Sequence, residues 1–336
     1  ARITKEALDQ CLAHDYSLFT RLPVVQTDSK GAYDYYFFTP YDYDRTSDKE
    51  TIYGVAGISV WNYYGLPTNS RQSSAGISPT QELIDSYETA DGHPILKKTG
   101  DGKYYKDDSH LQPNFNEAAG YDDQNPYENR DPRFYQSVYF NGAQRHWDDP
   151  DELVKIYDNA PRDSSCAIDK TTIRNTRTGY YMRKYDKHTS SYETPVTGYV
   201  RRFRLAELYL NFAEAANEAY GPTQQVEGYS GQASMSAIEA VNAVRTRADM
   251  PNVRDEYTTD RDVFRDRIWN ERRVEFAFEP LRFYDIRRWK ILDEAETVVT
   301  GMRATKNDSD GINGSLSANA NRMRILICFS RCLRTK

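Results

Sequence analysis

The last third of the chain carries apolar residues at intervals of three and four, the spacing that places side chains on one face of an α-helix. The stretch 203–220 shows this spacing clearly and stops at Gly221-Pro222, because proline cannot continue a helix. Its apolar positions are Leu205, Leu208, Phe212, Ala215 and Ala219. Such a stripe must be buried against other elements, so the sequence predicts a helical last third of the chain.

Two further helices follow in the sequence. One covers 238–248 and ends before Pro251, and the other runs from Thr259 to Phe278. Thr259 is the predicted N-cap of the latter, with Asp262 at the capping-box position. Antiparallel helices joined by short loops form hairpins, and such hairpins stack in tetratricopeptide-like arrays.

The first hundred residues contain two predicted helices between irregular segments. One helix covers 5–19, and a short one covers 78–92, with Ser78 as a natural N-cap. The tyrosine-rich segments 33–43 and 53–64 lack helical spacing and are punctuated by Gly, Pro, Asn and Ser. We therefore predict irregular loops for both.

Short strands are predicted in the middle of the chain. Residues 134–140 alternate between apolar and polar side chains, the pattern of a half-buried strand. Asn141-Gly142 is a strong hairpin signal, and the return strand is predicted to end near Trp147. Residues 180–185 alternate again and predict another strand.

Composition narrows the classes of function. The 336 residues include 44 Lys and Arg against 50 Asp and Glu, a net charge of -6 that disfavours a nucleic-acid partner. No stretch approaches the roughly 20 apolar residues of a membrane-spanning helix. The four cysteines lack C-x-x-C spacing, so zinc is not predicted and free thiols are preferred. They are Cys11, Cys166, Cys328 and Cys332, and a Cys11–Cys166 disulfide is the alternative.

Five sequence blocks occur in an order that resembles the SusD/RagB family of starch-utilisation-type nutrient-binding lipoproteins from Bacteroidetes outer membranes. The last block combines ERRVEFAFE at 271–279 with RFYDIRRWK at 282–290. The earlier blocks are PTQELID at 79–85, NRDPRF at 129–134, RLAELYLNFAEA at 204–215 and VNAVRTRA at 241–248. Together they span about residues 78–290, and five blocks in order are far more specific than one.

The resemblance implies a mainly α-helical, SusD-like fold, with tetratricopeptide-like helical hairpins, long irregular loops and a small β-hairpin. Residues 1–336 then form a partial domain: a loop-rich ligand-side region (1–200), a helical signature region (201–292) and an atypical tail (322–336). Family members are longer and begin with a lipidated cysteine and earlier helices, so we expect Ala1 to fall inside the N-terminal half. The basic, cysteine-rich tail departs from the family's aromatic-proline ending, and we hypothesise a frameshift near Met323, which sequencing the locus tests.

A cluster of charged residues in the third helix invites comparison with catalytic carboxylates. Its members are Glu271, Arg272, Arg273 and Glu275. Glu271 and Glu275 are one helical turn apart, whereas glycosidase carboxylates flank a bond across a cleft. We therefore predict an ion-pair network that ties the helix to residues 282–289. Asp131 and Arg133 are predicted to fix a loop.

Carbohydrates are bound by flat aromatic rings together with planar hydrogen-bonding side chains. Trp61, Tyr63 and Tyr64 lie together in a glycine-flanked segment, and Asn62 between them can hydrogen-bond sugar hydroxyls. Trp147 is a further candidate. Packing against the helical scaffold is the alternative for all of these rings. Trp269 and Trp289 lie in predicted helices and are expected to pack.

The resemblance implies cell-surface glycan binding and delivery to a SusC-like TonB-dependent transporter. It also implies an outer-membrane lipoprotein whose N-terminal lipid anchor is absent from this chain. We predict no catalytic activity, since the chain has no G-x-S-x-G, H-E-x-x-H, P-loop or dinucleotide motif. Neither cofactor nor metal is predicted, because the acidic patch at 308–311 has Ile312 where a calcium loop needs an oxygen ligand. A glycoside hydrolase and a peptide- or glycopeptide-binding protein are the alternatives.

Overall fold

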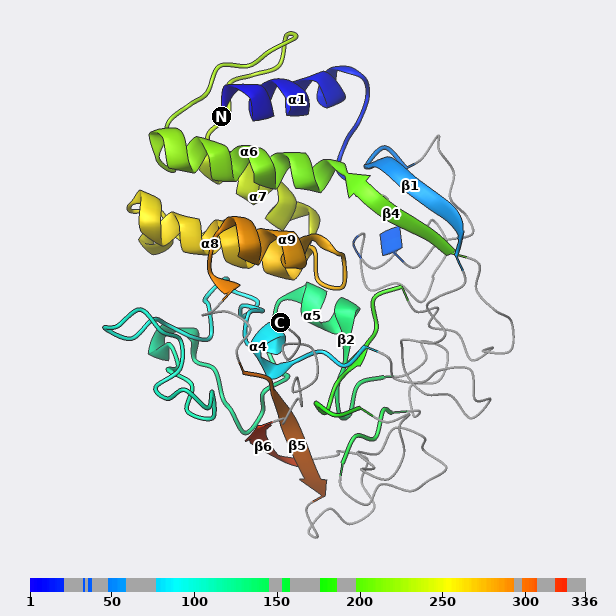
Figure 1. The fold of residues 1–336 in the computed structure, drawn as a ribbon, viewed down its shortest axis with the longest axis vertical. Coiled ribbons are helices and arrows are strands. Elements are labelled where there is room, and N and C mark those ends of the chain that lie inside the picture. Colours follow the sequence, from blue (N-terminus) through cyan, green and yellow to red (C-terminus); the bar gives the residue numbers. More distant parts are fainter. Residues whose placement is uncertain are drawn as a thin grey trace, which may run out of the picture.

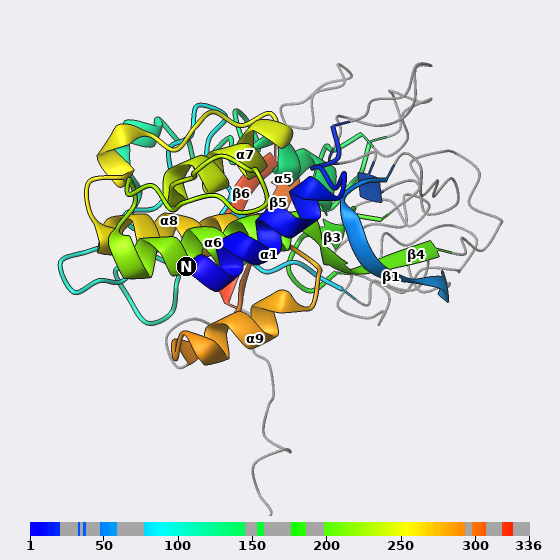
Figure 2. The ribbon, with the colours of Figure 1, turned by 90° about the horizontal axis from the view of Figure 1, so that it is seen from above.

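The longer helices fill one part of the described molecule, and short helices, strands and connecting segments fill the rest (Figure 1; Figure 2 shows the same arrangement from above). The computed structural model describes residues 1–20, 33, 36–37, 48–58, 77–144, 153–157, 176–185, 198–292, 298–306 and 318–324. The helices are α1 (Arg2–Ala13), α4 (Gln81–Ile84), α5 (Pro132–Ser137), α6 (Leu205–Tyr220), α7 (Ala237–Arg247), α8 (Arg261–Glu275) and α9 (Leu281–Arg288), with 3-10 turns η1 (Glu117–Ala119) and η3 (Asp255–Tyr257). The strands are β1 (Thr51–Ile58), β2 (Val138–Tyr139), β3 (Tyr181–Met182), β4 (Gly198–Arg204), β5 (Thr300–Lys306) and β6 (Ala318–Arg324). The mainly α-helical prediction is confirmed.

The helix α6 is the centre of a helical layer. It contacts α1, α7 and α8, and these helices lie above one another in Figure 1. The shared apolar cluster includes Leu8, Phe212, Val244, Phe264 and Ile268, all of them fully buried. Of the stripe predicted for 203–220, Leu205, Leu208 and Phe212 are buried, whereas Ala215 is half-buried and Ala219 is exposed.

The helices of this layer form close to their predicted positions. The predicted helices at 203–220 and 238–248 correspond to α6 and α7, which differ by one or two residues at their ends. The predicted N-cap of α8 is wrong by one residue: Asp260, not Thr259, accepts hydrogen bonds from the backbone of Asp262 and Val263. The carboxylate of Asp260 therefore satisfies two free N–H groups of the first turn.

The two predicted N-terminal helices are both shorter than expected. The helix α1 ends at Ala13 and not at Phe19, because Asp15 takes a left-handed backbone conformation with φ of 65°. The helix α4 begins after Thr80, whose hydroxyl accepts from the backbone of Leu83, and not after Ser78. It ends at Ile84 because the following bonds close tighter turns, in which Ser86 donates to the carbonyl of Leu83.

The loop prediction for 53–64 is wrong where the structure describes it. Residues 51–58 form β1, which pairs antiparallel with β4. Three register shifts interrupt this pairing, so the side chains do not alternate regularly along β1. Tyr33, Tyr36 and Phe37 of the other predicted loop have helical backbone and are buried.

The predicted strand at 134–140 is mostly helical. Asp131 caps α5 by accepting from the backbone of Arg133, and Pro132 holds the first helical position. Phe134 is buried from α5, and Val138 is buried from the extended backbone that follows the helix. Only Val138–Tyr139 form a strand.

The tight turn of the predicted hairpin is confirmed, but the strand before this turn pairs with a different strand from the predicted one. Gly142 has φ of 85°, and Ala143 donates to the carbonyl of Phe140, as a tight turn requires. The strand β2 nevertheless pairs with β3, which confirms the strand predicted at 180–185, and Gln144 bridges to Leu153. Trp147 lies outside the described residues.

The strands β5 and β6 form a third antiparallel pair, which was not predicted from the sequence. This pair lies directly against residues 176–180, since Met302 donates to the carbonyl of Thr178 over 2.8 Å. A Cβ at Gly301 would lie 2.5 Å from the same oxygen, so only glycine permits this approach. No helix in the described ranges is both long and apolar enough to cross a bilayer.

Candidate functional site

All five residues predicted to bind ligand lie outside the described part of the chain. They are Trp61, Asn62, Tyr63, Tyr64 and Trp147. The strand β1 ends at Ile58, three residues before Trp61, and β1 is fixed by its pairing with β4. The position of the aromatic cluster therefore stays a prediction, although the strand that precedes the cluster in the sequence is described.

Two described tyrosines of the other tyrosine-rich segment, Tyr33 and Tyr36, belong to a buried core. Tyr33, Tyr36 and Phe37 pack with Tyr185 and are almost fully shielded from solvent. The guanidinium of Arg201 lies 3.9 Å from the ring centre of Tyr36. Rings that are covered by protein on both faces cannot serve as a platform for a sugar, so these residues are structural.

The carboxylates of α8 form buried ion pairs. Arg133 donates to Glu271 over 2.5 Å and to Glu275 over 3.1 Å. Arg204 donates to Glu275 over 2.6 Å, and Arg247 donates to the same oxygen. All five side chains are almost completely buried. Each carboxylate thus faces at least two guanidinium groups, as Arg245 also pairs with Glu271.

This arrangement fixes the charge state of Glu275. Burial alone would raise the pKa of its carboxyl, but the guanidinium groups of Arg247, Arg204 and Arg133 outweigh burial and hold the pKa well below its usual range. A general acid needs a raised pKa and an open approach to substrate. Glu275 has neither, which supports the structural role predicted for the cluster.

The predicted connection between α8 and the following segment is confirmed. Arg272 binds Asp285 of α9 through two hydrogen bonds of 3.0 and 3.1 Å. Trp269 and Trp289 stack with ring centres 4.5 Å apart, and Trp289 donates to Glu214 over 2.8 Å. Both tryptophans therefore pack between helices, as expected.

A lysine joins the same buried region. Lys184 donates to Glu279 and to the hydroxyl of Tyr33, each over 2.8 Å. Burial lowers the pKa of Lys184 to about 8, against the opposing attraction of Glu279. Its ammonium is enclosed by protein groups and has no access to a ligand.

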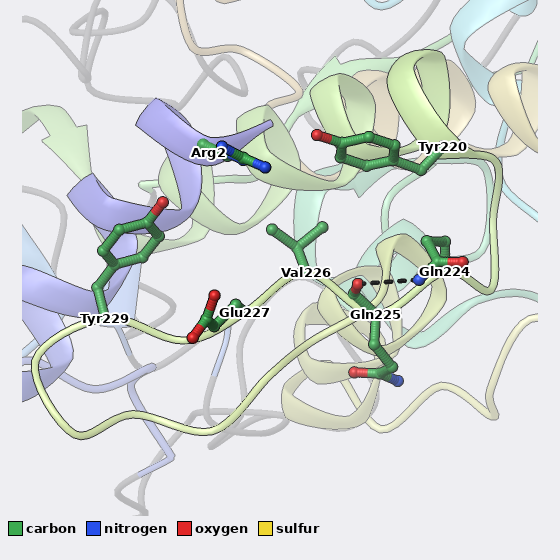
Figure 3. Close-up of a pocket in the computed structure, with 7 residues that line it drawn as sticks. All are labelled: Arg2, Tyr220, Gln224, Gln225, Val226, Glu227 and Tyr229. Atoms are coloured by element: carbon green, nitrogen blue, oxygen red, sulfur yellow. Dashed lines mark hydrogen bonds between the residues drawn. The ribbon is translucent and has the colours of Figure 1, made fainter.

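An open pocket lies at the other side of the helical layer, between the start of α1 and the segment that follows α6 (Figure 3). Its volume is about 470 Å³, within the usual range for small-ligand sites. It is lined by Arg2, Tyr220, Gln224, Gln225, Val226, Glu227 and Tyr229. Figure 3 shows the two tyrosine rings on opposite sides, with Val226 between them.

The pocket wall is held in place by a buried ion pair of α1. Lys5 and Asp9, both fully buried, pair over 2.6 Å. Asp9 also accepts from the backbone of Tyr229 over 2.8 Å, and Lys5 donates to the carbonyl of Ala233 over 3.0 Å. The loop after α6 is thereby fixed to α1, although the two segments are more than 200 residues apart.

Sequence reasoning missed this pocket. The signal available was the polar run Gln224-Gln225 directly after the helix stop at Gly221-Pro222, but nothing local indicates that it meets α1. In the described ranges, no group of three or more His, Cys, Asp or Glu side chains is arranged to hold a metal ion. Cys11 is a free thiol.

Comparison with known proteins gives consistent results. The sequence profile of the SusD family matches residues 34–324. A solved SusD-like protein from Bacteroides fragilis NCTC 9343 is 25% identical with a TM-score of 0.63, covering 96% of this chain and 56% of that protein. A SusD-like carbohydrate binding protein from the same strain is 26% identical with a TM-score of 0.55, covering 82% of this chain and 50% of that protein.

A curated relative is a SusD-like protein of Formosa agariphila. It is 38% identical over 91 residues, which amount to 27% of this chain and 15% of that protein. The chain thus spans only about half the length of the two solved relatives and a smaller share of the curated one.

Proposed function

Because the chain belongs to the SusD family, we propose that it binds glycans at the cell surface and delivers oligosaccharides to a SusC-like TonB-dependent transporter. The observation that carries this proposal is the family match over residues 34–324, which includes all five sequence blocks between residues 79 and 290. The carbohydrate binding named for one of the solved relatives supports it. The same membership supports an outer-membrane lipoprotein on the cell surface.

The ligand site is proposed at the predicted aromatic cluster. Trp61, Tyr63 and Tyr64 offer ring faces for stacking, and Asn62 offers an amide for hydroxyl groups. Trp147 is proposed to complete the site. Loops positioned by a rigid scaffold are where binding side chains tend to be placed, and β1 paired with β4 supplies that scaffold here.

Binding without chemistry is supported by the buried carboxylates. Glu271 and Glu275 are the pair that most invites a hydrolytic mechanism, and both are enclosed by guanidinium groups. The helical layer of α1, α6, α7 and α8 is proposed as the transporter-facing scaffold, since it presents several helices in one stack.

The experiment compares the chain with a Trp61→Ala/Tyr63→Ala/Tyr64→Ala variant on a panel of oligosaccharides by isothermal titration calorimetry. We expect an affinity loss of about tenfold or more, the usual effect of removing aromatic hot spots. Tyr53→Ala is the matched control, because Tyr53 lies on β1 with 61% of its surface exposed and is not part of the cluster.

Each alternative has its own outcome. Unchanged affinity in the triple variant contradicts the placement of the site, and failure of the unsubstituted chain to bind any oligosaccharide contradicts the function. Reducing ends released from mixed glycans would identify a hydrolase. Binding confined to a parallel panel of peptides and glycopeptides would favour that class of ligand.

A further inference from the structure

We propose that the pocket between α1 and the segment after α6 is a second saccharide site that holds one neutral sugar ring, an inference that rests on the glycan binding proposed above. None of the predicted ligand residues lines this pocket. Its position on the helical layer, its charge pattern and its fixed wall all come from described residues.

The charged groups of the pocket suit a neutral, hydroxyl-rich ligand. Arg2 and Glu227 both line it and carry opposite charges, and neither forms a hydrogen bond or ion pair with the described parts of the chain. A carboxylate accepts from neighbouring sugar hydroxyls, and a guanidinium donates to their oxygens, through charge-assisted hydrogen bonds. Because the two charges cancel, the pocket favours neither anions nor cations.

The apolar part of the pocket suits the C–H face of a sugar ring. Tyr220 is 45% exposed at the end of α6, and Tyr229 is half-buried on the opposite side (Figure 3). Val226 lies between them with its side chain almost fully buried. Rings with an apolar body and a polar tip provide both stacking surface and hydrogen bonds to the ring edge.

Only one of the two glutamines is free to reach a ligand. The amide of Gln225 donates to Glu239 over 2.8 Å and is directed away from the pocket in Figure 3. The amide of Gln224 makes one long bond of 3.3 Å to the carbonyl of Gln225, so its second N–H and its oxygen remain available.

The wall of the pocket is fixed before any ligand binds. Val226 and Met235 exchange two backbone hydrogen bonds of 2.9 and 3.0 Å, which close the base of the loop. A Cβ at Gly228 would lie 1.9 Å from the carbonyl oxygen of Gln232, so the loop is closely packed there. A preformed wall lowers the ordering cost of binding, which matters for a ligand as small as one sugar ring.

The test measures binding of glucose, galactose, mannose and xylose by saturation-transfer NMR and titration, with the dipeptide Gly-Gly as a zwitterionic probe. In a Tyr220→Ala/Tyr229→Ala variant, we expect sugar affinity at this pocket to fall about tenfold or more, as for other aromatic hot spots. For Glu227→Gln, we expect a loss of about threefold, the effect of weakening one or two hydrogen bonds.

The control for Glu227→Gln is Glu6→Gln, which removes one exposed carboxylate of α1 that does not line the pocket. It should leave sugar affinity unchanged. Melting curves followed by circular dichroism should coincide for the unsubstituted chain, Glu227→Gln and Glu6→Gln, because neither carboxylate makes a hydrogen bond with the described residues.

The triple variant at Trp61, Tyr63 and Tyr64 separates the two proposals. Monosaccharide binding that persists in this variant and disappears in the Tyr220/Tyr229 variant supports the second site. If the triple variant alone abolishes all sugar binding, the second site is wrong and the proposed function stands. The second site is also wrong if the pocket prefers Gly-Gly, or if the Tyr220/Tyr229 variant keeps the sugar affinity of the unsubstituted chain. If the unsubstituted chain binds no sugar at all, both proposals are wrong.

Discussion

The interior of the helical layer and its junction with the loop-rich region are stabilised by different interactions. Within the layer, α1, α6, α7 and α8 share apolar side chains such as Phe212, Phe264 and Ile268, which are fully buried. At the junction, α8 turns Glu271 and Glu275 toward guanidinium groups from α5, β4 and α7. One helix therefore contributes to an apolar interface and to an ionic one.

Because the interactions differ, the two interfaces should respond differently to the substitution of a side chain. An apolar contact loses stability in proportion to the volume removed, so a small truncation has a small effect. A buried ion pair that loses one partner leaves an uncompensated charge in a region that water does not reach. The junction should thus tolerate single changes far less well than the layer beside it.

The largest expected effect follows from Glu275→Gln. This change leaves Arg133, Arg204 and Arg247 around a neutral amide, and we expect a loss of about 3–5 kcal/mol in the free energy of unfolding. Urea titration followed by circular dichroism measures it.

The matched change in the apolar interface is Ile268→Val on the same helix. Because Ile268 is fully buried, removing one methylene should cost about 0.5–1.5 kcal/mol. Equal losses in the two variants would show that the ionic junction is no more sensitive than the apolar layer, contrary to the comparison.

Acid should weaken the junction before it weakens the apolar layer. In the folded chain, burial raises the pKa values of Glu275 and Glu279, but neighbouring cations outweigh burial and hold both below their usual range. The cations are guanidinium groups at Glu275, and the Arg204 guanidinium and the Lys184 ammonium at Glu279. The unfolded chain therefore takes up protons first, as the pH falls below the ordinary glutamate value of about 4.3. Stability is fully present above that pH and is lost below it.

The pH dependence can be assigned to a residue by comparing variants. Each carboxyl that gains a proton on unfolding adds about 1.4 kcal/mol per pH unit to the slope of stability against pH. Glu275→Gln should reduce the slope between pH 4 and pH 3 by up to this amount, and Ile268→Val should preserve it. The same slope in all three proteins would contradict a role for Glu275.

The two interfaces also differ in how far the sequence predicts them. The stripe of α6 is local, and so is the helix stop at Gly221-Pro222, which is why α6 and α7 form within two residues of the predicted ends. The ion pairs of Glu275 join residues up to 142 positions apart. Their structural character was predictable from helix geometry, but their partners at Arg204 and Arg247 were not.

Long-range pairing also explains the errors among the strands. The strand β1 depends on β4, about 150 residues further along the chain, and register shifts remove the alternation that would indicate a strand. In α5, the local signal Asp131-Pro132 outweighs alternation, because a cap and a preset φ favour the first helical turn. The pocket wall could not be predicted from the sequence for the same reason as β1, because Asp9 contacts Tyr229 only in the folded chain.

The smallest expected effect tests a local signal inside the helical layer. Asp260 accepts two backbone hydrogen bonds of 2.8 and 2.9 Å at the start of α8, whereas Thr259 is exposed and forms no hydrogen bond with the described residues. Asp260→Ala should therefore cost about 1 kcal/mol of unfolding free energy, and Thr259→Ala should cost almost nothing. Urea titrations of the two variants measure the difference. A larger loss for Thr259→Ala than for Asp260→Ala would show that Thr259 is the cap. Combining Asp260→Ala with Ile268→Val should give the sum of the single losses, because the cap and the apolar contact share no partner.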